Sequence, residues 1–155
     1  MTTIRPAQAA DIDAIASLLD EMDRFYGGTS TEPLEDRLAQ IDTALFGPTA
    51  TSRALVAWDE ESLVGLVSYS FLWPAAGLTR SLYMKDLYVA NSCRSAGVDK
   101  ILEERFMNEL FTIARDNSCC RVEWAADVDD TPALNFYDKL GFKPSTSQLF
   151  YRTVL

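Results

Sequence analysis

Residues 121–142 read RVEWAADVDDTPALNFYDKLGF, and they carry the clearest fold signal in the chain. The run 122–125 predicts a short strand, an acidic loop follows, and residues 131–140 predict a helix. Gly141 stands where a helix C-terminus needs a positive φ, and Phe142 begins the next extended run. The stretch therefore predicts a strand, a helix and a further strand in succession.

A second motif lies upstream, where residues 82–89 read LYMKDLYV and lead through RSAG at 94–97 into a helical pattern. Backbone N–H groups at a helix N-terminus point at anions, and small residues let a phosphate come close. Arg94 and Gly97 fit such a loop. Asp99 has two interpretations: it favours the helix start through the macrodipole, or it weakens an anion site by roughly one to a few kcal/mol.

Together the two motifs resemble the GNAT superfamily of N-acetyltransferases over nearly the whole chain, nearest in pattern to polyamine and thialysine acetyltransferase-like members. The resemblance implies an α/β fold with a mixed, mostly antiparallel central sheet flanked by helices. Its fourth and fifth strands would splay apart after about Val89. The implied enzyme is an N-acyltransferase that moves an acetyl or other acyl group from acetyl-CoA, or another acyl-CoA, to the amine of a small molecule.

Two alternatives stay open beside that function. The donor could be an acyl-carrier protein, which also presents a pantetheine arm, or the protein could keep the GNAT fold as a binding protein without catalysis. A fold alone does not decide between them.

The resemblance assigns the donor to the central strand and the loop after it. It implies a bulge near residues 87–89, with an N–H around Tyr88 or Val89 polarising the thioester. Asp130, where the family often has asparagine, serves as a helix N-cap but lacks the amide donor. The expected cofactor-binding residues are Leu87, Tyr88, Val89, Arg94, Ser95, Ala96, Gly97, Val98, Asp99, Lys100 and Asp130.

The resemblance makes Tyr137 the acid that protonates the departing sulfur, whereas helical spacing alone favours a core aromatic. Asp86 is the candidate to orient the amine or a water, with a surface acid as the alternative, and Glu123 is a second candidate. Strand alternation puts Lys85 and Asp86 on opposite faces, and Lys85 reverses a charge that polyamine-type relatives carry. The expected acceptor-binding residues are Phe25, Tyr26, Trp73, Tyr83, Lys85 and Glu123.

Composition limits the remaining possibilities. A chain of 155 residues with 48% hydrophobic content predicts one domain over residues 1–155. A net charge of −9 argues against nucleic acid and favours cationic or neutral partners. No run approaches the roughly 20 apolar residues of a membrane span. Three cysteines without metal spacing and no histidine predict a metal-free protein of the reducing cytoplasm, and we expect a homodimer.

Periodicity predicts the other elements. Apolar residues at helical spacing mark helices from 12 to 22 and from 34 to 45, and a long helix over 97–116. Strands are expected at 3–6, 53–58, 63–72, 80–89, 120–125 and around 148–153.

Overall fold

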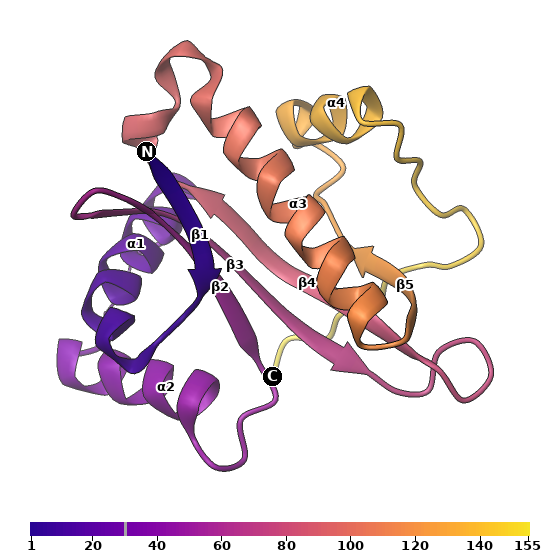
Figure 1. Ribbon diagram of the computed structural model, residues 1–155, viewed down its shortest axis with the longest axis horizontal. Helices are drawn as coiled ribbons and strands as arrows, with labels where there is room; N and C mark the ends of the chain where they lie inside the picture. The colour runs from indigo at the N-terminus through magenta and orange to yellow at the C-terminus, as the bar shows by residue number, and fades with distance from the viewer. Residues whose placement is uncertain (30) are drawn as a thin grey trace. The chain divides into compact units, whose positions relative to one another are not determined.

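The computed structural model describes residues 1–29 and 31–155 and, for Ala96, the backbone alone (Figure 1). The chain divides into two compact units, Met1–Ala125 and Ala126–Leu155. None of the helices in the described ranges combines the length and apolar character that crossing a bilayer requires.

The first unit is built on a five-stranded sheet with the strand order β1-β2-β3-β4-β5. The first four strands pair antiparallel, and β5 pairs parallel with β4. The predicted mixed, mostly antiparallel sheet is therefore confirmed. The strands are β1 Thr2–Pro6, β2 Arg53–Asp59, β3 Ser62–Leu72, β4 Arg80–Val89 and β5 Cys119–Trp124.

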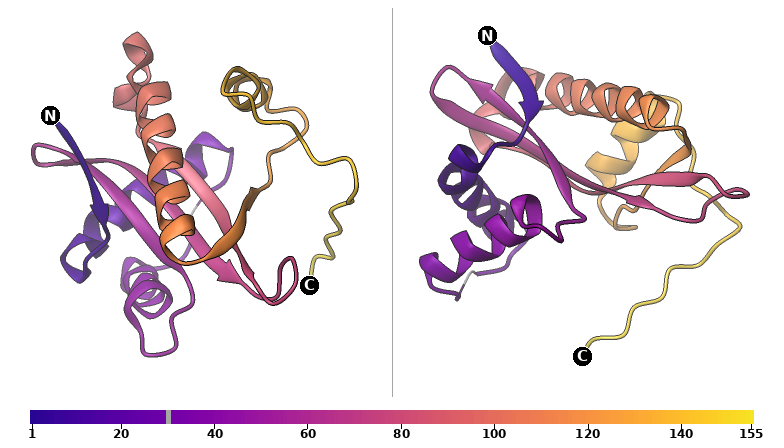
Figure 2. Two further views of the ribbon diagram at one scale, coloured as in Figure 1. Left: turned by 45° about the vertical axis from the view of Figure 1, so that its right-hand side comes forward. Right: turned by 60° about the horizontal axis from the view of Figure 1, so that its bottom comes forward.

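Helices cover both faces of this sheet (Figures 1 and 2). The 3₁₀ turn η1 (Ala9–Asp11) and helices α1 (Ile12–Phe25) and α2 (Leu34–Phe46) connect β1 to β2, and the two helices lie on one face. Helix α3 (Val98–Asp116) connects β4 to β5 and lies on the other face. Because both faces are covered, the middle strands bury successive residues instead of alternating ones.

A partly buried ion pair fixes the start of α1. Both terminal guanidinium nitrogens of Arg5 donate to the Asp11 carboxylate at 2.8 Å, and the N–H of Gln8 donates to the same side chain at 2.7 Å. These hydrogen bonds, led by those from Arg5, hold the pKa of Asp11 below its usual range. Asp11 thus stays ionised and joins β1 to the helix that follows.

The second unit contains helix α4 (Thr131–Lys139), which ends before Gly141 at φ +87°. The positive φ predicted at this glycine is confirmed. The strand predicted around 148–153 is wrong, because no part of 142–155 is extended in a sheet and Phe150 and Tyr151 are exposed. A strand needs a neighbouring strand to satisfy its backbone, and the described residues of this unit form none.

Gly65 of β3 sets how closely α3 approaches the sheet. A Cβ at this position would lie 2.8 Å from Cε2 of Phe106, a fully buried residue of α3. Gly65 pairs with Val89, so the close approach lies beside the end of β4. The absence of a side chain here therefore helps to place α3 against the part of the sheet that leads into it.

We expect Gly65→Ala to lower the free energy of unfolding by about 1–3 kcal/mol, because the added methyl group overpacks the contact with Phe106. Urea unfolding measures the loss. Combining it with Phe106→Leu should cost less than the sum of the two single substitutions, since the smaller side chain makes room. Strict additivity would contradict the contact.

Candidate functional site

β4 loses its parallel partner halfway along its length. β5 pairs with β4 only from Arg80 to Met84, whereas β3 pairs with β4 as far as Val89. Within the described part of the chain, residues 85–89 of β4 thus have no partner strand on the β5 side. The sequence predicts that the strands part after about Val89; pairing instead ends at Met84, because β5 itself ends at Trp124.

Hydrogen bonds to β3 show which backbone groups of β4 face this open side. The N–H of Ala90 donates to the carbonyl of Val64 at 2.8 Å, in the same register as the strand pairing. Bonded and non-bonded pairs alternate along an antiparallel ladder. Tyr88 therefore turns its N–H and C=O toward β3, whereas Leu87 and Val89 turn theirs toward the open side. Of the two N–H groups predicted to polarise a thioester, only that of Val89 faces outward.

A β-bulge lies where pairing with β5 ends. Ser68 pairs with Asp86, but the residue after Ser68 pairs with Met84, so Lys85 is the extra residue. The sequence predicts this bulge near residues 87–89, and its position at Lys85 corrects that prediction. The hydroxyl of Ser68 accepts the N–H of Asp86 at 3.2 Å, which satisfies the backbone at the irregularity. The bulge also interrupts the strand alternation that predicts opposite faces for Lys85 and Asp86.

The β4–α3 loop, residues 90–97, ends at the N-terminus of α3. It consists of two 3₁₀ turns, η2 (Asn91–Cys93) and η3 (Ser95–Gly97). Gly97 adopts φ +72° at the N-cap, and no side chain caps α3. The first N–H groups of a helix without a side-chain cap can bind an anion. The side chain of Ala96, a predicted contact in this loop, lies outside the described residues.

Arg94 of this loop is folded back against the sheet. Its Nε donates to Oδ1 of Asn91 at 3.1 Å, and one terminal nitrogen donates to the carbonyl of Val89 at 3.1 Å. The guanidinium carbon lies 4.4 Å from the ring centre of Phe25 and 5.4 Å from that of Tyr88. These contacts fix the arginine side chain and occupy the outward-facing carbonyl of Val89.

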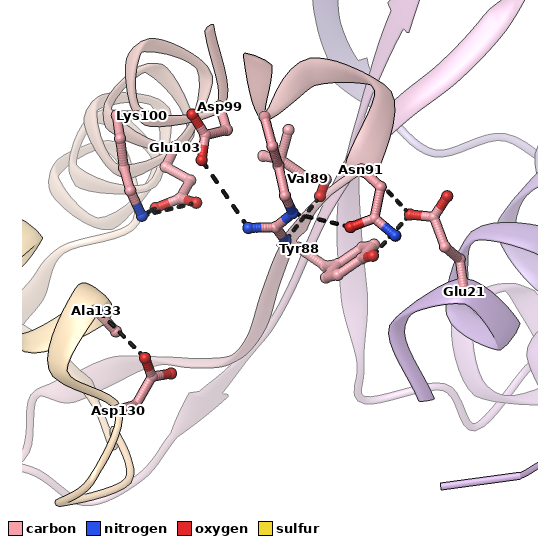
Figure 3. Close-up of polar contacts among 10 residues, drawn as sticks. Glu21, Tyr88, Val89, Asn91, Asp99, Lys100, Glu103, Asp130 and Ala133 are labelled. Atoms are coloured by element: carbon pink, nitrogen blue, oxygen red, sulfur yellow. Dashed lines mark hydrogen bonds and ion pairs between the residues drawn. The ribbon is translucent and has the colours of Figure 1, made fainter. Parts of the chain in front are cut away.

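Carboxylates lie beside both cationic side chains that the sequence assigns to anion binding. Asp99, which is only 7% exposed, approaches Arg94 with 3.9 Å between oxygen and nitrogen. Lys100 pairs with Glu103 at 3.3 Å, and burial raises the pKa of that carboxyl. Figure 3 shows both pairs at the start of α3. Asp99 therefore belongs to the first turn of the helix and also faces the arginine of the loop.

Glu21 of α1 contacts β4 and the β4–α3 loop, and it is not among the site residues predicted from the sequence. Its Oε2 accepts the hydroxyl of Tyr88 at 2.6 Å and the N–H of Asn91 at 3.1 Å (Figure 3). Burial and the neighbouring carboxylate raise the pKa of Tyr88 to about 12, so its hydroxyl keeps its proton. A signal was available, because Glu21 lies at helical spacing from Leu18 and Phe25 on the apolar face of α1.

Several predicted acceptor residues gather on the α1 side of the sheet. Phe25 and Tyr26 make an edge-to-face contact at the end of α1, with ring centres 5.1 Å apart. Tyr83, Asp86 and Tyr88 pair with alternate residues of β3 and so share one face. Tyr88 contacts Glu21 of α1, which identifies that face as the one covered by α1.

Trp73 is not brought together with Phe25. It follows the end of β3 that pairs with Ser81. Tyr88 lies seven positions further along β4 than Ser81, or about 23 Å at 3.3 Å per residue. The indole N–H donates to the carbonyl of Leu78 at 3.1 Å within its own exposed loop. A contact of Trp73 with the acceptor would therefore lie at the opposite end of β4 from the β4–α3 loop.

Glu123 of β5 lies beside Tyr83 of β4 across the parallel ladder. One of its carboxylate oxygens accepts the hydroxyl of Ser81 at 2.6 Å and Nε of Arg121 at 2.9 Å. These bonds hold the side chain of Glu123 against Ser81 and Arg121.

In the second unit, Asp130 caps α4. Its side chain accepts the N–H of Ala133 at 3.2 Å (Figure 3), as expected of an N-cap. Phe136, at 8% exposure, fills the buried position of the helix, whereas Tyr137 is half-buried beside it with ring centres 5.5 Å apart. Phe136 is thus the core aromatic of α4. Helical spacing alone would also have allowed Tyr137 in that position.

Comparisons with known proteins agree with this arrangement. Residues 15–142 match the family model described as acetyltransferase (GNAT) family. The chain belongs to the GNAT acetyltransferase family. As a member, it is a GNAT-type N-acyltransferase. No curated protein matches the chain.

Solved structures share the GNAT fold over the whole length of the chain. An integron cassette protein from the mobile metagenome of V. cholerae has a TM-score of 0.86 at 24% identity, covering 99% of this chain and 92% of its own. A Trypanosoma brucei acetyltransferase has a TM-score of 0.73 at 24% identity, covering 99% and 100%. AAC(6')-Iy, in complex with the bisubstrate analog CoA-S-monomethyl-acetylneamine, has a TM-score of 0.75 at 13% identity, covering 100% and 99%.

We expect Arg94→Ala to destabilise the protein more when residue 99 is aspartate than when it is asparagine. Loss of the arginine leaves the buried carboxylate without its cationic neighbour, a difference of about 1 kcal/mol after allowance for the partial exposure of Arg94. Urea unfolding of Arg94→Ala, Asp99→Asn and the double variant measures this coupling. Equal losses in the two backgrounds would show that the ion pair contributes nothing.

Proposed function

We propose that this GNAT protein transfers an acetyl or another acyl group from a CoA thioester to the amine of a small molecule. The observation that carries the proposal is the open side of β4, which leads directly into the N-terminus of α3. An extended pantetheine arm can pair with an open strand edge as an added strand does. A pyrophosphate suits the N–H groups of a helix N-terminus, and a Cβ at Gly97 would meet no atom within 4 Å.

An acyl-CoA supplies an activated thioester to this site. The outward-facing N–H of Val89 donates to the thioester oxygen and stabilises the negative charge that develops there. The backbone of Leu87 bonds to the amides of the pantetheine arm. Arg94 already occupies the carbonyl of Val89, so these contacts are made by the two N–H groups and by the carbonyl of Leu87.

The acceptor amine must be neutral when it attacks. Phe25, Tyr26 and Tyr83 supply an aromatic surface for the acceptor, and Asp86 takes the proton from the ammonium group directly or through a water. The amine nitrogen then bonds to the acyl carbon and loses its second proton to a water, and the bond from that carbon to sulfur breaks. Tyr137 gives its proton to the departing thiolate. The burial of Phe136 supports this role, because Phe136 and not Tyr137 takes the core position of α4.

A cationic small molecule is the proposed class of acceptor. The chain carries a net charge of −9, which attracts cations at long range. AAC(6')-Iy, which has the same fold, is in complex with an analog that joins CoA to acetylneamine. Both observations support an acceptor with one or more amino groups.

An acyl-carrier protein is the second candidate donor, and a specific observation favours it. Arg94 and Lys100 both have a carboxylate beside them, which reduces the positive potential available to a pyrophosphate. An acyl-carrier protein presents one phosphate where CoA presents its pyrophosphate, and so depends less on that potential.

Titration calorimetry with acetyl-CoA tests the donor. We expect micromolar binding, and we expect Asp99→Asn to tighten it by about 1 kcal/mol at low salt, with a smaller gain at high salt, because the substitution frees the charge of Arg94. Asp116→Asn is the control: it removes the same charge from the far end of α3, about 25 Å away. No binding of acetyl-CoA, with turnover from an acyl-carrier donor, would favour the alternative.

Tyr137→Phe should keep the fold and most of the donor affinity while lowering kcat about a hundredfold, since the departing sulfur loses its proton donor. Steady-state kinetics with saturating acetyl-CoA and a panel of amines measure the change, with calorimetry as the check on binding. Unchanged turnover would remove Tyr137 from the mechanism.

A further inference from the structure

One carboxylate oxygen, on Glu21 near the end of α1, contacts both β4 and the β4–α3 loop. Oε2 of Glu21 accepts both the hydroxyl of Tyr88 and the N–H of Asn91, at 2.6 and 3.1 Å (Figure 3). Tyr88 lies near the end of β4 and is 2% exposed, and Asn91 is the first residue of η2. A single side chain of α1 therefore joins the end of the strand to the start of the loop.

Phe25 makes a second contact one turn later. The guanidinium of Arg94 lies over its ring at 4.4 Å, within the range of a cation–π interaction. The rings of Phe25 and Tyr88 are themselves 6.1 Å apart. The position of the loop arginine thus also depends on where α1 ends.

The β4–α3 loop has little internal structure to hold its shape. Its two 3₁₀ turns are three residues each, too short to be stable alone. The helix that follows has no side-chain cap at Gly97. The conformation of the loop must therefore come largely from contacts with its surroundings. Among the described residues, α1 supplies two of these contacts, from Glu21 to Asn91 and from Phe25 to Arg94, and β3 holds the N–H of Ala90.

We propose that Glu21 is a positioning residue that sets the affinity for the donor by fixing the β4–α3 loop. The inference rests on the proposed function, because it takes this loop to bind the phosphates of CoA. Glu21 itself does not contact the donor: it acts through Asn91 and Tyr88. It also explains why a carboxylate stands on the apolar face of α1, where a hydrophobic residue is the usual choice.

The proposal also links the two sides of the site. Phe25 and Tyr26, which we assign to the acceptor, directly follow the turn of α1 that carries Glu21. A displacement of this turn would move the acceptor surface and the β4–α3 loop together. Donor affinity should then respond to substitutions in α1 that lie on the acceptor side of the sheet.

The test measures the binding of coenzyme A by calorimetry in Glu21→Ala, Glu21→Gln and Tyr88→Phe. Loss of hydrogen bonds to a charged group should weaken binding about tenfold or more in Glu21→Ala. Glu21→Gln should lie between this variant and the unaltered protein, because its amide oxygen can still accept both bonds but is a weaker acceptor than a carboxylate oxygen. Asp23→Asn, an exposed acid on the same helix, is the matched control and should change affinity by less than about twofold.

A second readout separates positioning from general stability. Without ligand, the amide of Asn91 should exchange its hydrogen faster in Glu21→Ala than in the unaltered protein, measured by NMR, while amides in the middle of β3 stay equally protected. If the unaltered chain binds coenzyme A, and Glu21→Ala and Tyr88→Phe bind it equally well, this inference alone is overturned. Failure of the unaltered chain to bind coenzyme A would overturn the proposed function and this inference with it.

Discussion

The end of pairing between β4 and β5 at Met84 is the constraint on which the candidate site depends. A strand that loses one neighbour has backbone N–H and C=O groups that need another partner. Antiparallel pairing with β3 continues to Val89 and fixes which groups these are, namely those of Leu87 and Val89. The backbone groups of a strand point sideways in the plane of the sheet, so an extended ligand can add to this edge as a strand does.

Charge decides how well the loop beyond this edge can hold an anion. The N-terminus of α3 offers uncapped N–H groups and a dipole that favours negative charge. Asp99 opposes this by facing Arg94, which also bonds to the carbonyl of Val89. The arginine is thereby shared between structural contacts and any ligand. The backbone of the loop would then supply more of the phosphate binding than its side chains do, which makes the correct shape of the loop, and hence Glu21, more important.

Local patterns predicted much of this structure, and contacts between distant residues account for what they missed. The order of strands and helices and the positive φ of Gly141 follow from periodicity and turn chemistry, which act over a few residues. The position of the bulge at Lys85 depends on a register with β3, which no local pattern encodes. Glu21 and Tyr88 are 67 residues apart, so their bond could be suspected only from an acid on an apolar helix face. The run 148–153 has strand composition, but composition does not supply a neighbouring strand.

Residue-resolved amide hydrogen exchange with and without acetyl-CoA tests most directly whether the open edge of β4 holds the donor. We expect slower exchange at the N–H groups of Leu87 and Val89 when acetyl-CoA binds, because Leu87 pairs with the pantetheine arm and Val89 donates to the thioester oxygen. Little change is expected at Tyr88, whose N–H is already paired with β3. Protection confined to other residues, with Leu87 and Val89 exchanging equally in both states, would contradict the assignment of the donor to this edge.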